Sequence, residues 1–152
     1  MEYNKENSGE KDMIRKFEKN DINDVLQIWK SENIKAHNFI SREYWENNYS
    51  FVKEALPNAE IYVYITKEKI IGFIGLNNNY IEGIFVDTNH QCNGAGTALL
   101  NKVKENKNKL TLSVYMKNTD AVNFYKKNDF IITSENTDKD TNETEYTMTW
   151  NK

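Results

Sequence analysis

The chain has 152 residues and a formal net charge of −3, and 38% of its residues are hydrophobic. This length suits one domain with a single core, and the acidic balance argues against a nucleic-acid-binding surface. The single cysteine excludes an internal disulfide and a cluster of thiolate metal ligands, so we expect no metal site. Without a membrane-spanning apolar run or a signal peptide, the sequence predicts a cytoplasmic protein with neither a membrane nor a nucleic acid as partner.

The first twelve residues are almost entirely polar or charged. This composition predicts that residues 1–12 form a disordered extension and that the domain covers residues 13–152. Side chains that alternate around Ile14 predict a first strand at the edge of a sheet. Asn20 and Asp21 then offer side chains that can cap a following amphipathic helix.

A connector of mixed polar and aromatic character, residues 33–40, is expected between the first and second helices. His37 in this segment has two interpretations, a contact to substrate or a surface or structural histidine. Ser41 is the expected N-cap of the second helix, which Pro57 ends.

Three β runs follow, over residues 61–66, 70–76 and 80–86, with short turns between them. Three consecutive antiparallel strands differ from the alternation of strand and helix in a parallel nucleotide-binding sheet. Gly72 and Gly75 indicate a bulge or a close approach of the backbone within the sheet.

The third of these strands ends at a turn that contains Gly94 and Gly96 and leads into a helix. Glycine lets a ligand approach the backbone, and the free N–H groups of a helix start can hold a phosphate. A simple tight turn is the alternative. Two nucleotide-binding motifs do not fit, because residues 115–117 include no acid and Thr97 stands where a P-loop needs lysine.

The remaining pattern predicts a strand over residues 110–114, a helix over residues 119–128, and a final hairpin of residues 130–134 and 144–150. No internal repeat is visible.

Two motifs resemble signatures of the GNAT superfamily of N-acetyltransferases. The segment Gln91-x-x-Gly94-x-Gly96 after an apolar strand is similar to the acetyl-CoA pyrophosphate loop of that family. The segment Asn118-x-x-Ala121-x-x-Phe124-Tyr125 is similar to the second signature of that family. The two motifs occur in the family's order and spacing.

The likeness runs from about Met13 to the end of the chain. It implies an α/β protein of the mixed α+β kind, with a central, mostly antiparallel sheet of about seven strands that is splayed at the cofactor site and flanked by about four helices. The family usually has Gly-Phe after the second motif, where this chain has Asp129-Phe130. Aspartate tolerates a left-handed conformation, so we expect the helix to end there as in the family.

The resemblance further implies acetyl-CoA as co-substrate and the primary amine of a small molecule or peptide as acceptor. The expected cofactor contacts lie in two places. The first is the end of the third β run together with the glycine loop, and the second is the second motif. They are Ile84, Phe85, Val86, Gln91, Cys92, Asn93, Gly94, Ala95, Gly96, Thr97, Asn118 and Tyr125.

Two residues are the expected catalytic groups. The resemblance implies that Tyr125 is the general acid that protonates the leaving thiolate, the alternative being a core aromatic. Glu82, on the strand before the loop, is the candidate general base, the alternative being a carboxylate that binds the charge of the acceptor or faces solvent. Ser113 occupies a second position used by some relatives and cannot act as a base at neutral pH. Cys92 is better interpreted as a variable motif residue than as a nucleophile.

A different class of function remains open, a non-catalytic acyl-CoA-binding or sensing module with the same fold. A phenol at position 125 favours the enzyme. The sequence does not identify the acceptor, but His37 and Glu82 are the candidate contacts to the acceptor. The sequence also does not decide between a monomer and a homodimer.

Overall fold

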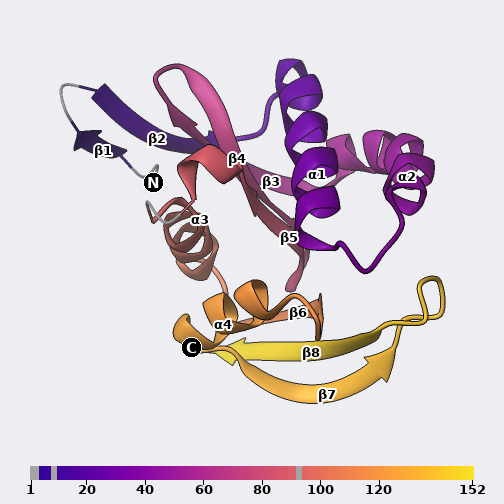
Figure 1. The fold of residues 1–152 in the computed structure, drawn as a ribbon. Coiled ribbons are helices and arrows are strands. Elements are labelled where there is room, and N and C mark those ends of the chain that lie inside the picture. Colours follow the sequence, from indigo (N-terminus) through magenta and orange to yellow (C-terminus); the bar gives the residue numbers. More distant parts are fainter. Residues whose placement is uncertain (1–3, 8–9, 92–93) are drawn as a thin grey trace.

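The computed structural model describes residues 4–7, 10–91 and 94–152. Their strands form one sheet in the order β1-β2-β3-β4-β5-β6-β8-β7 (Figure 1). Neighbouring strands are antiparallel except β5 and β6. The bounds are β1 Asn4–Asn7, β2 Glu10–Lys16, β3 Glu60–Thr66, β4 Lys69–Asn77, β5 Tyr80–Val86, β6 Lys109–Tyr115, β7 Ile131–Thr137 and β8 Thr144–Asn151.

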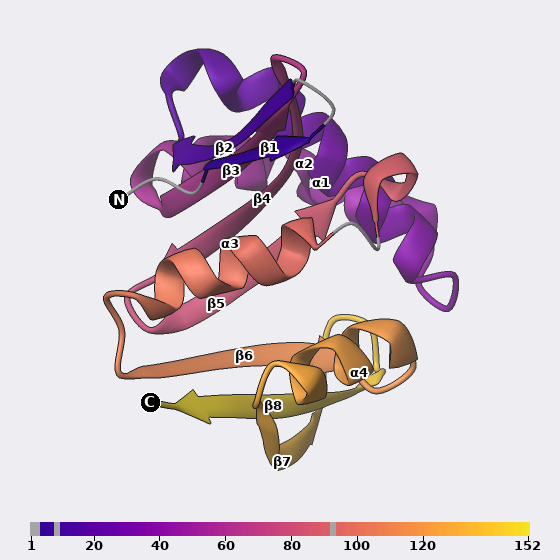
Figure 2. The ribbon, with the colours of Figure 1, turned by 90° about the vertical axis from the view of Figure 1, so that its left-hand side faces the viewer.

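Helices cover both faces of this sheet (Figures 1 and 2). On one face lie α1 and α2, and on the other lie α3 and α4. Their bounds are α1 Ile22–Ala36, α2 Arg42–Ala55, α3 Ala95–Lys104 and α4 Thr119–Lys127, with short 3-10 helices at Lys19–Asp21, Leu56–Asn58 and Thr88–His90. Within the described part of the chain, no helix has the length and apolar character needed to cross a membrane.

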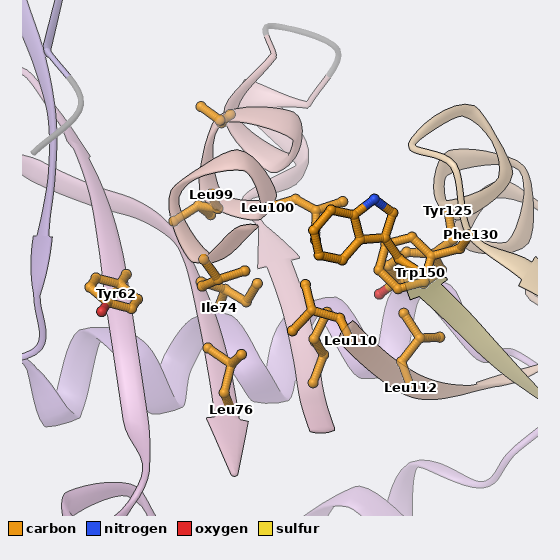
Figure 3. Packing of buried hydrophobic residues seen from close by; sticks show 14 of the residues in the cluster. Tyr62, Ile74, Leu76, Leu99, Leu100, Leu110, Leu112, Tyr125, Phe130 and Trp150 are labelled. Atoms are coloured by element: carbon orange, nitrogen blue, oxygen red, sulfur yellow. The ribbon is translucent and has the colours of Figure 1, made fainter. Parts of the chain in front are cut away.

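The hydrophobic core divides into two clusters because successive strand residues point to opposite faces. On β3, Ile61 and Val63 pack with α1, whereas Tyr62 and Tyr64 pack with α3. The cluster on the α3 side of the sheet is the larger one and also includes residues of α4 (Figure 3). The mixed, mostly antiparallel sheet with helices on both faces confirms the predicted fold class.

The described residues of the N-terminal segment, 4–7 and 10–12, depart from the predicted disordered extension of residues 1–12. Asn4–Asn7 and Glu10–Lys16 pair as antiparallel strands, with Asn4 opposite Met13. A strand at the edge of a sheet is held by backbone hydrogen bonds and needs no apolar side chains, so the polar composition did not predict it. The strand around Ile14 is therefore not an edge strand, because β2 lies between β1 and β3.

Capping of the first helix was also predicted incorrectly. Asp21 makes no side-chain cap to α1. Its carboxylate instead accepts two hydrogen bonds from the Arg15 guanidinium, at 2.8 and 3.0 Å, and one from the Glu18 backbone N–H at 2.7 Å. The Arg15 guanidinium lowers the pKa of Asp21. The predicted cap of α2 is confirmed, since the Ser41 hydroxyl accepts from the Tyr44 N–H at 3.3 Å.

The predicted meander of three antiparallel strands is confirmed as β3, β4 and β5. The register between β4 and β5 shifts at Gly75, which is the expected bulge. Gly72 is the expected close approach, because a Cβ atom there would lie 2.8 Å from the Phe85 carbonyl oxygen.

Gly72 and Gly75 form a matched pair on one strand that tests this close approach. Gly72→Ala should lower the free energy of unfolding by about 1–3 kcal/mol, because the backbone oxygen of Phe85 must move. Gly75→Ala places its Cβ 3.9 Å from Ile61, an ordinary contact, and should change stability much less. Urea unfolding of both variants measures the difference, and equal losses would contradict the assignment.

Candidate active site

The two parallel strands at the centre of the sheet separate along their length. β5 and β6 pair only at Tyr80 with Thr111 and at Ile81 with Leu112. Beyond these residues the edge of β5 that faces β6 has no strand partner, although its other edge stays paired with β4 through Val86. The main-chain groups between Ile84 and Val86 that face this open edge are therefore available to a ligand that enters between the strands, except the Val86 carbonyl oxygen, which accepts from the Gln91 side chain.

The start of α3 follows the open end of β5. Gly94 has φ +85°, a left-handed conformation that favours glycine, and is the N-cap of the helix. The first helical hydrogen bond runs from the Ala98 N–H to the Gly94 carbonyl oxygen at 2.9 Å. The N–H groups of Ala95, Gly96 and Thr97 precede this bond and have no helical acceptor. They form a positive end that suits an anion.

The two sequence motifs meet at Gly96. A Cβ atom at this position would lie 3.2 Å from the ring of Phe124 on α4. Gly96 therefore lets the first turn of α3 lie close to α4, so that the glycine loop and the second motif form one site. Of the predicted cofactor contacts, Cys92 and Asn93 lie outside the described residues.

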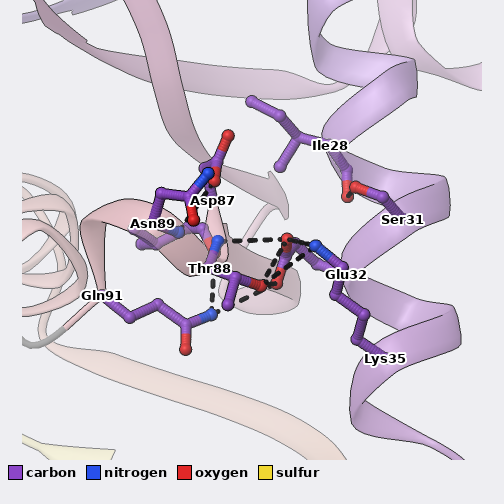
Figure 4. Close-up of polar contacts among 9 residues, drawn as sticks. Ile28, Ser31, Glu32, Lys35, Asp87, Thr88, Asn89 and Gln91 are labelled. Carbon is purple, nitrogen blue, oxygen red and sulfur yellow. Dashed lines mark hydrogen bonds and ion pairs between the residues drawn. The ribbon is translucent and has the colours of Figure 1, made fainter.

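Thr88 and Gln91, which follow β5, are held by a residue that sequence reasoning missed. Glu32 on α1 is buried, and its carboxylate accepts hydrogen bonds from the Thr88 N–H at 3.2 Å and the Thr88 hydroxyl at 2.9 Å (Figure 4). The Gln91 side-chain amide donates to Glu32 at 3.2 Å and to the Val86 carbonyl oxygen at 2.8 Å. Lys35 completes the cluster at 3.5 Å from Glu32. No local pattern marks Glu32 as a contact of this segment, because Thr88 and Gln91 are more than fifty residues away in the sequence.

Tyr125 lies on α4 in the larger core cluster, beside Phe130 and Trp150 (Figure 3). Its ring centroid is 5.4 Å from that of Phe124 and 5.7 Å from that of Phe130. Burial raises the pKa of its hydroxyl well above the ordinary value, so the phenol keeps its proton at neutral pH.

The end of α4 matches its sequence prediction. Asp129 has φ +71°, the left-handed conformation that was expected where the family usually has glycine. The Phe130 N–H then donates to the Tyr125 carbonyl oxygen at 3.0 Å.

His37 lies closer to α1 than the predicted connector of residues 33–40 implied, since α1 continues to Ala36. The ring is buried, and its Nδ1 lies 2.9 Å from the Asn33 carbonyl oxygen. Its Nε2 lies 3.2 Å from Nδ2 of Asn118, whose Oδ1 accepts from the Ala121 N–H. These partners require a neutral imidazole that donates through Nδ1 and accepts through Nε2. His37 therefore orients the side chain that caps α4.

Glu82 is exposed on β5, at the bulge. Gly83 pairs with Gly75 and Ile81 pairs with Leu76, which leaves Glu82 as the extra residue. A bulge redirects the side chain that it carries. Burial raises the pKa of the nearby Tyr80 hydroxyl, and the charge of Glu82 adds to that shift.

A pocket of about 200 Å³ lies between the start of α2 and the loop that joins β7 to β8. Its lining is aromatic and polar, formed by Phe39, Ile40, Ser41, Tyr44, Asp140 and Thr141. Behind it the Tyr115 hydroxyl donates to Asp138 at 2.5 Å. Asp140 in the lining and Asp138 in the same loop thus place two acidic residues at or beside this pocket.

The chain is similar to known proteins in sequence and in fold. The Acetyltransferase (GNAT) family model matches residues 22–130. The peptidyl-lysine N-acetyltransferase YiaC of Escherichia coli (strain K12) is 31% identical over 122 residues, which are 79% of this chain and 84% of YiaC.

Two solved structures are also similar to this chain in fold. Apo-form YjaB from Escherichia coli has a TM-score of 0.81 and 25% identity, over 91% of this chain and 97% of YjaB. A Bacillus anthracis str. Ames acetyltransferase in complex with acetyl coenzyme A has a TM-score of 0.58 and 27% identity, over 62% of each chain.

The neutral state of His37 gives a pH-dependent stability. Burial lowers the pKa of His37 below its ordinary 6.5, so as the pH falls the unfolded chain takes up this proton before the folded protein does. The stability that the neutral ring contributes is complete above pH 6.5 and is lost as the pH falls through the lowered pKa. His37→Phe keeps a ring against Trp45 and should flatten the loss of unfolding free energy between about pH 7 and pH 5. Urea unfolding across this range checks it, and a slope equal to that of the parent would contradict it.

Proposed function

This chain belongs to the GNAT family of acetyltransferases, and on that basis we propose that it transfers the acetyl group of acetyl-CoA to the side-chain amine of a lysine in a peptide. The lysine acceptor is supported by the names of similar proteins, which are peptidyl-lysine N-acetyltransferases. Acetyl-CoA as donor is supported by the similar acetyltransferase whose structure contains it.

One observation carries the proposal: the glycine loop and the second motif meet beside the gap between β5 and β6. The N–H groups of Ala95, Gly96 and Thr97 would receive the pyrophosphate, because they lack helical acceptors. The open edge of Ile84–Val86 would bind the pantetheine arm through main-chain groups. Asn118, at the start of α4, would lie at the far side of the same gap.

Tyr125 is the proposed general acid. The amine nitrogen attacks the thioester carbonyl carbon, the bond from carbon to sulfur breaks, and Tyr125 donates its proton to the departing thiolate. The attacking nitrogen loses one proton to solvent as the amide forms, and solvent returns a proton to the Tyr125 phenolate. The phenol carries its proton at neutral pH, since the ordinary pKa of tyrosine is about 10 and burial raises the pKa of Tyr125 further. Direct transfer of this kind requires no covalent intermediate on the protein.

Glu82 is the proposed base for the acceptor. An amine nucleophile must be neutral, and a lysine side chain is an ammonium ion at neutral pH. Glu82 is exposed beside the open gap and would take the ammonium proton, through water. The carboxylates near the Phe39–Tyr44 pocket would attract the cationic acceptor before this step.

Acetylation of a defined peptide tests the proposed function. A peptide with a blocked N-terminus and one lysine, mixed with acetyl-CoA and the protein, should release free thiol and gain the mass of one acetyl group on the lysine. The same peptide with arginine in place of lysine is the control. If the protein acetylates small amines and releases thiol but acetylates no lysine peptide, the peptide acceptor is contradicted. The acetyltransferase activity itself would still be supported.

Tyr125→Phe tests the general acid. Tyr125 and Tyr62 are both 8% exposed in the same core cluster, so Tyr62→Phe is a matched control. Tyr125→Phe should keep its affinity for acetyl-CoA and lower kcat roughly a hundredfold, the usual size of general acid catalysis. Tyr62→Phe should leave kcat close to that of the parent. If both variants turn over like the parent, Tyr125 is a core aromatic only.

Glu82→Gln tests the base. Its rate should fall most at neutral pH and recover as alkaline solution deprotonates the amine without help. Glu68→Gln, at the exposed turn between β3 and β4, is the control carboxylate. A loss that does not change with pH would instead show that Glu82 binds the acceptor.

A further inference from the structure

Glu32 belongs to neither sequence motif. Among the described residues, the polar contacts of its side chain go to Thr88 and Gln91, which precede the glycine turn, and to Lys35 on its own helix. Glu32 is 7% exposed on α1. Its two oxygens accept from the Thr88 N–H, the Thr88 hydroxyl, the Gln91 amide and Lys35 (Figure 4). Thr88 and Gln91 lie between the end of β5 and the start of α3.

A buried carboxylate is costly unless it is hydrogen-bonded, and these donors offset that cost. Its negative charge opposes the binding of a phosphate nearby, so Glu32 is not a phosphate ligand. Lys35 offsets part of this charge, at 3.5 Å from Glu32 and 3.3 Å from the Thr88 hydroxyl. The role that these contacts leave for Glu32 is to fix the position of the segment.

The Gln91 side chain shows how closely the segment is specified. Its amide has two N–H groups, and their acceptors are the Val86 carbonyl oxygen and Glu32 Oε1. Both hydrogens of this first motif residue are therefore used within the protein. Gln91 binds the end of β5 to α1 through Glu32, and its side chain has no N–H left for a phosphate.

We propose that Glu32 is a positioning residue for the pyrophosphate of acetyl-CoA. It holds Thr88 and Gln91 against α1, and the turn that follows then begins α3 with its free N–H groups beside the gap between β5 and β6. The proposal rests on the proposed function of this site as an acetyl-CoA site.

A glutamine at position 32 cannot replace the carboxylate. If its amide nitrogen occupied the Oε1 position, it would face the Gln91 amide nitrogen, which is also a donor. If it occupied the Oε2 position, it would face the Thr88 N–H. Either orientation sets two donors against each other, so Glu32→Gln keeps the shape of the side chain and loses its function.

The test compares two acetyl donors, acetyl-CoA and acetyl-pantetheine, which lacks the pyrophosphate. Glu32→Gln should raise the KM for acetyl-CoA roughly tenfold, in line with the loss of a hydrogen bond to a charged group, and leave kcat within about twofold. The kcat/KM for acetyl-pantetheine should not change. Asp24→Asn, an exposed carboxylate on the same helix, is the control and should behave like the parent with both donors.

A second variant keeps the test informative if Glu32→Gln folds poorly. Thr88→Val removes the hydroxyl partner from the loop without changing α1, and should show the same selective effect at smaller size. Equal losses with both donors, or none with acetyl-CoA, would overturn the role of Glu32. A parent protein that transfers acetyl from neither donor would overturn the proposed function instead.

Discussion

The site depends on the early end of the pairing between β5 and β6. These strands are bonded at Tyr80 and Ile81 and then separate, while β5 stays paired with β4 and β6 stays paired with β8. Because each strand keeps its other neighbour, the gap costs the sheet only the hydrogen bonds of one ladder. Main-chain groups without a strand partner can hydrogen-bond a ligand, and the helix start that follows β5 suits an anion such as a pyrophosphate.

A single helix supports both motifs around this gap. Glu32 on α1 holds the segment before α3, and His37, just after the same helix, accepts from Asn118 at the start of α4. The third connection is direct, since Gly96 lets α3 approach Phe124. The segment that precedes α3 and the helix that carries Tyr125 are thus placed by contacts to α1 and to the residue that follows it. A shift of α1 would move both.

Local patterns predicted much of this structure. Alternation and short turns gave the meander of β3, β4 and β5, and the motif spacing located the glycine turn and α4. The left-handed Asp129 followed from the family pattern and from the conformations that aspartate tolerates. Each of these features is decided by residues close together in the sequence.

The features that were missed depend on residues far apart. Glu32 reaches Thr88 and Gln91 across the fold, and nothing in its own helix marks it. Asp21 had a suitable local pattern for a cap, but the Arg15 guanidinium offers its carboxylate a stronger, charged partner. The pairing of β1 with β2 rests on backbone bonds, to which composition is insensitive.

The central claim is that the gap between β5 and β6 and the start of α3 bind one donor molecule. Backbone amide shifts of the isotope-labelled protein during titration with coenzyme A measure this most directly. If both segments bind one molecule, saturable shifts are expected at Ile84–Val86 and at Ala95, Gly96 and Thr97, with one common dissociation constant. Shifts confined to other parts of the chain, or different constants for the two segments, would contradict it.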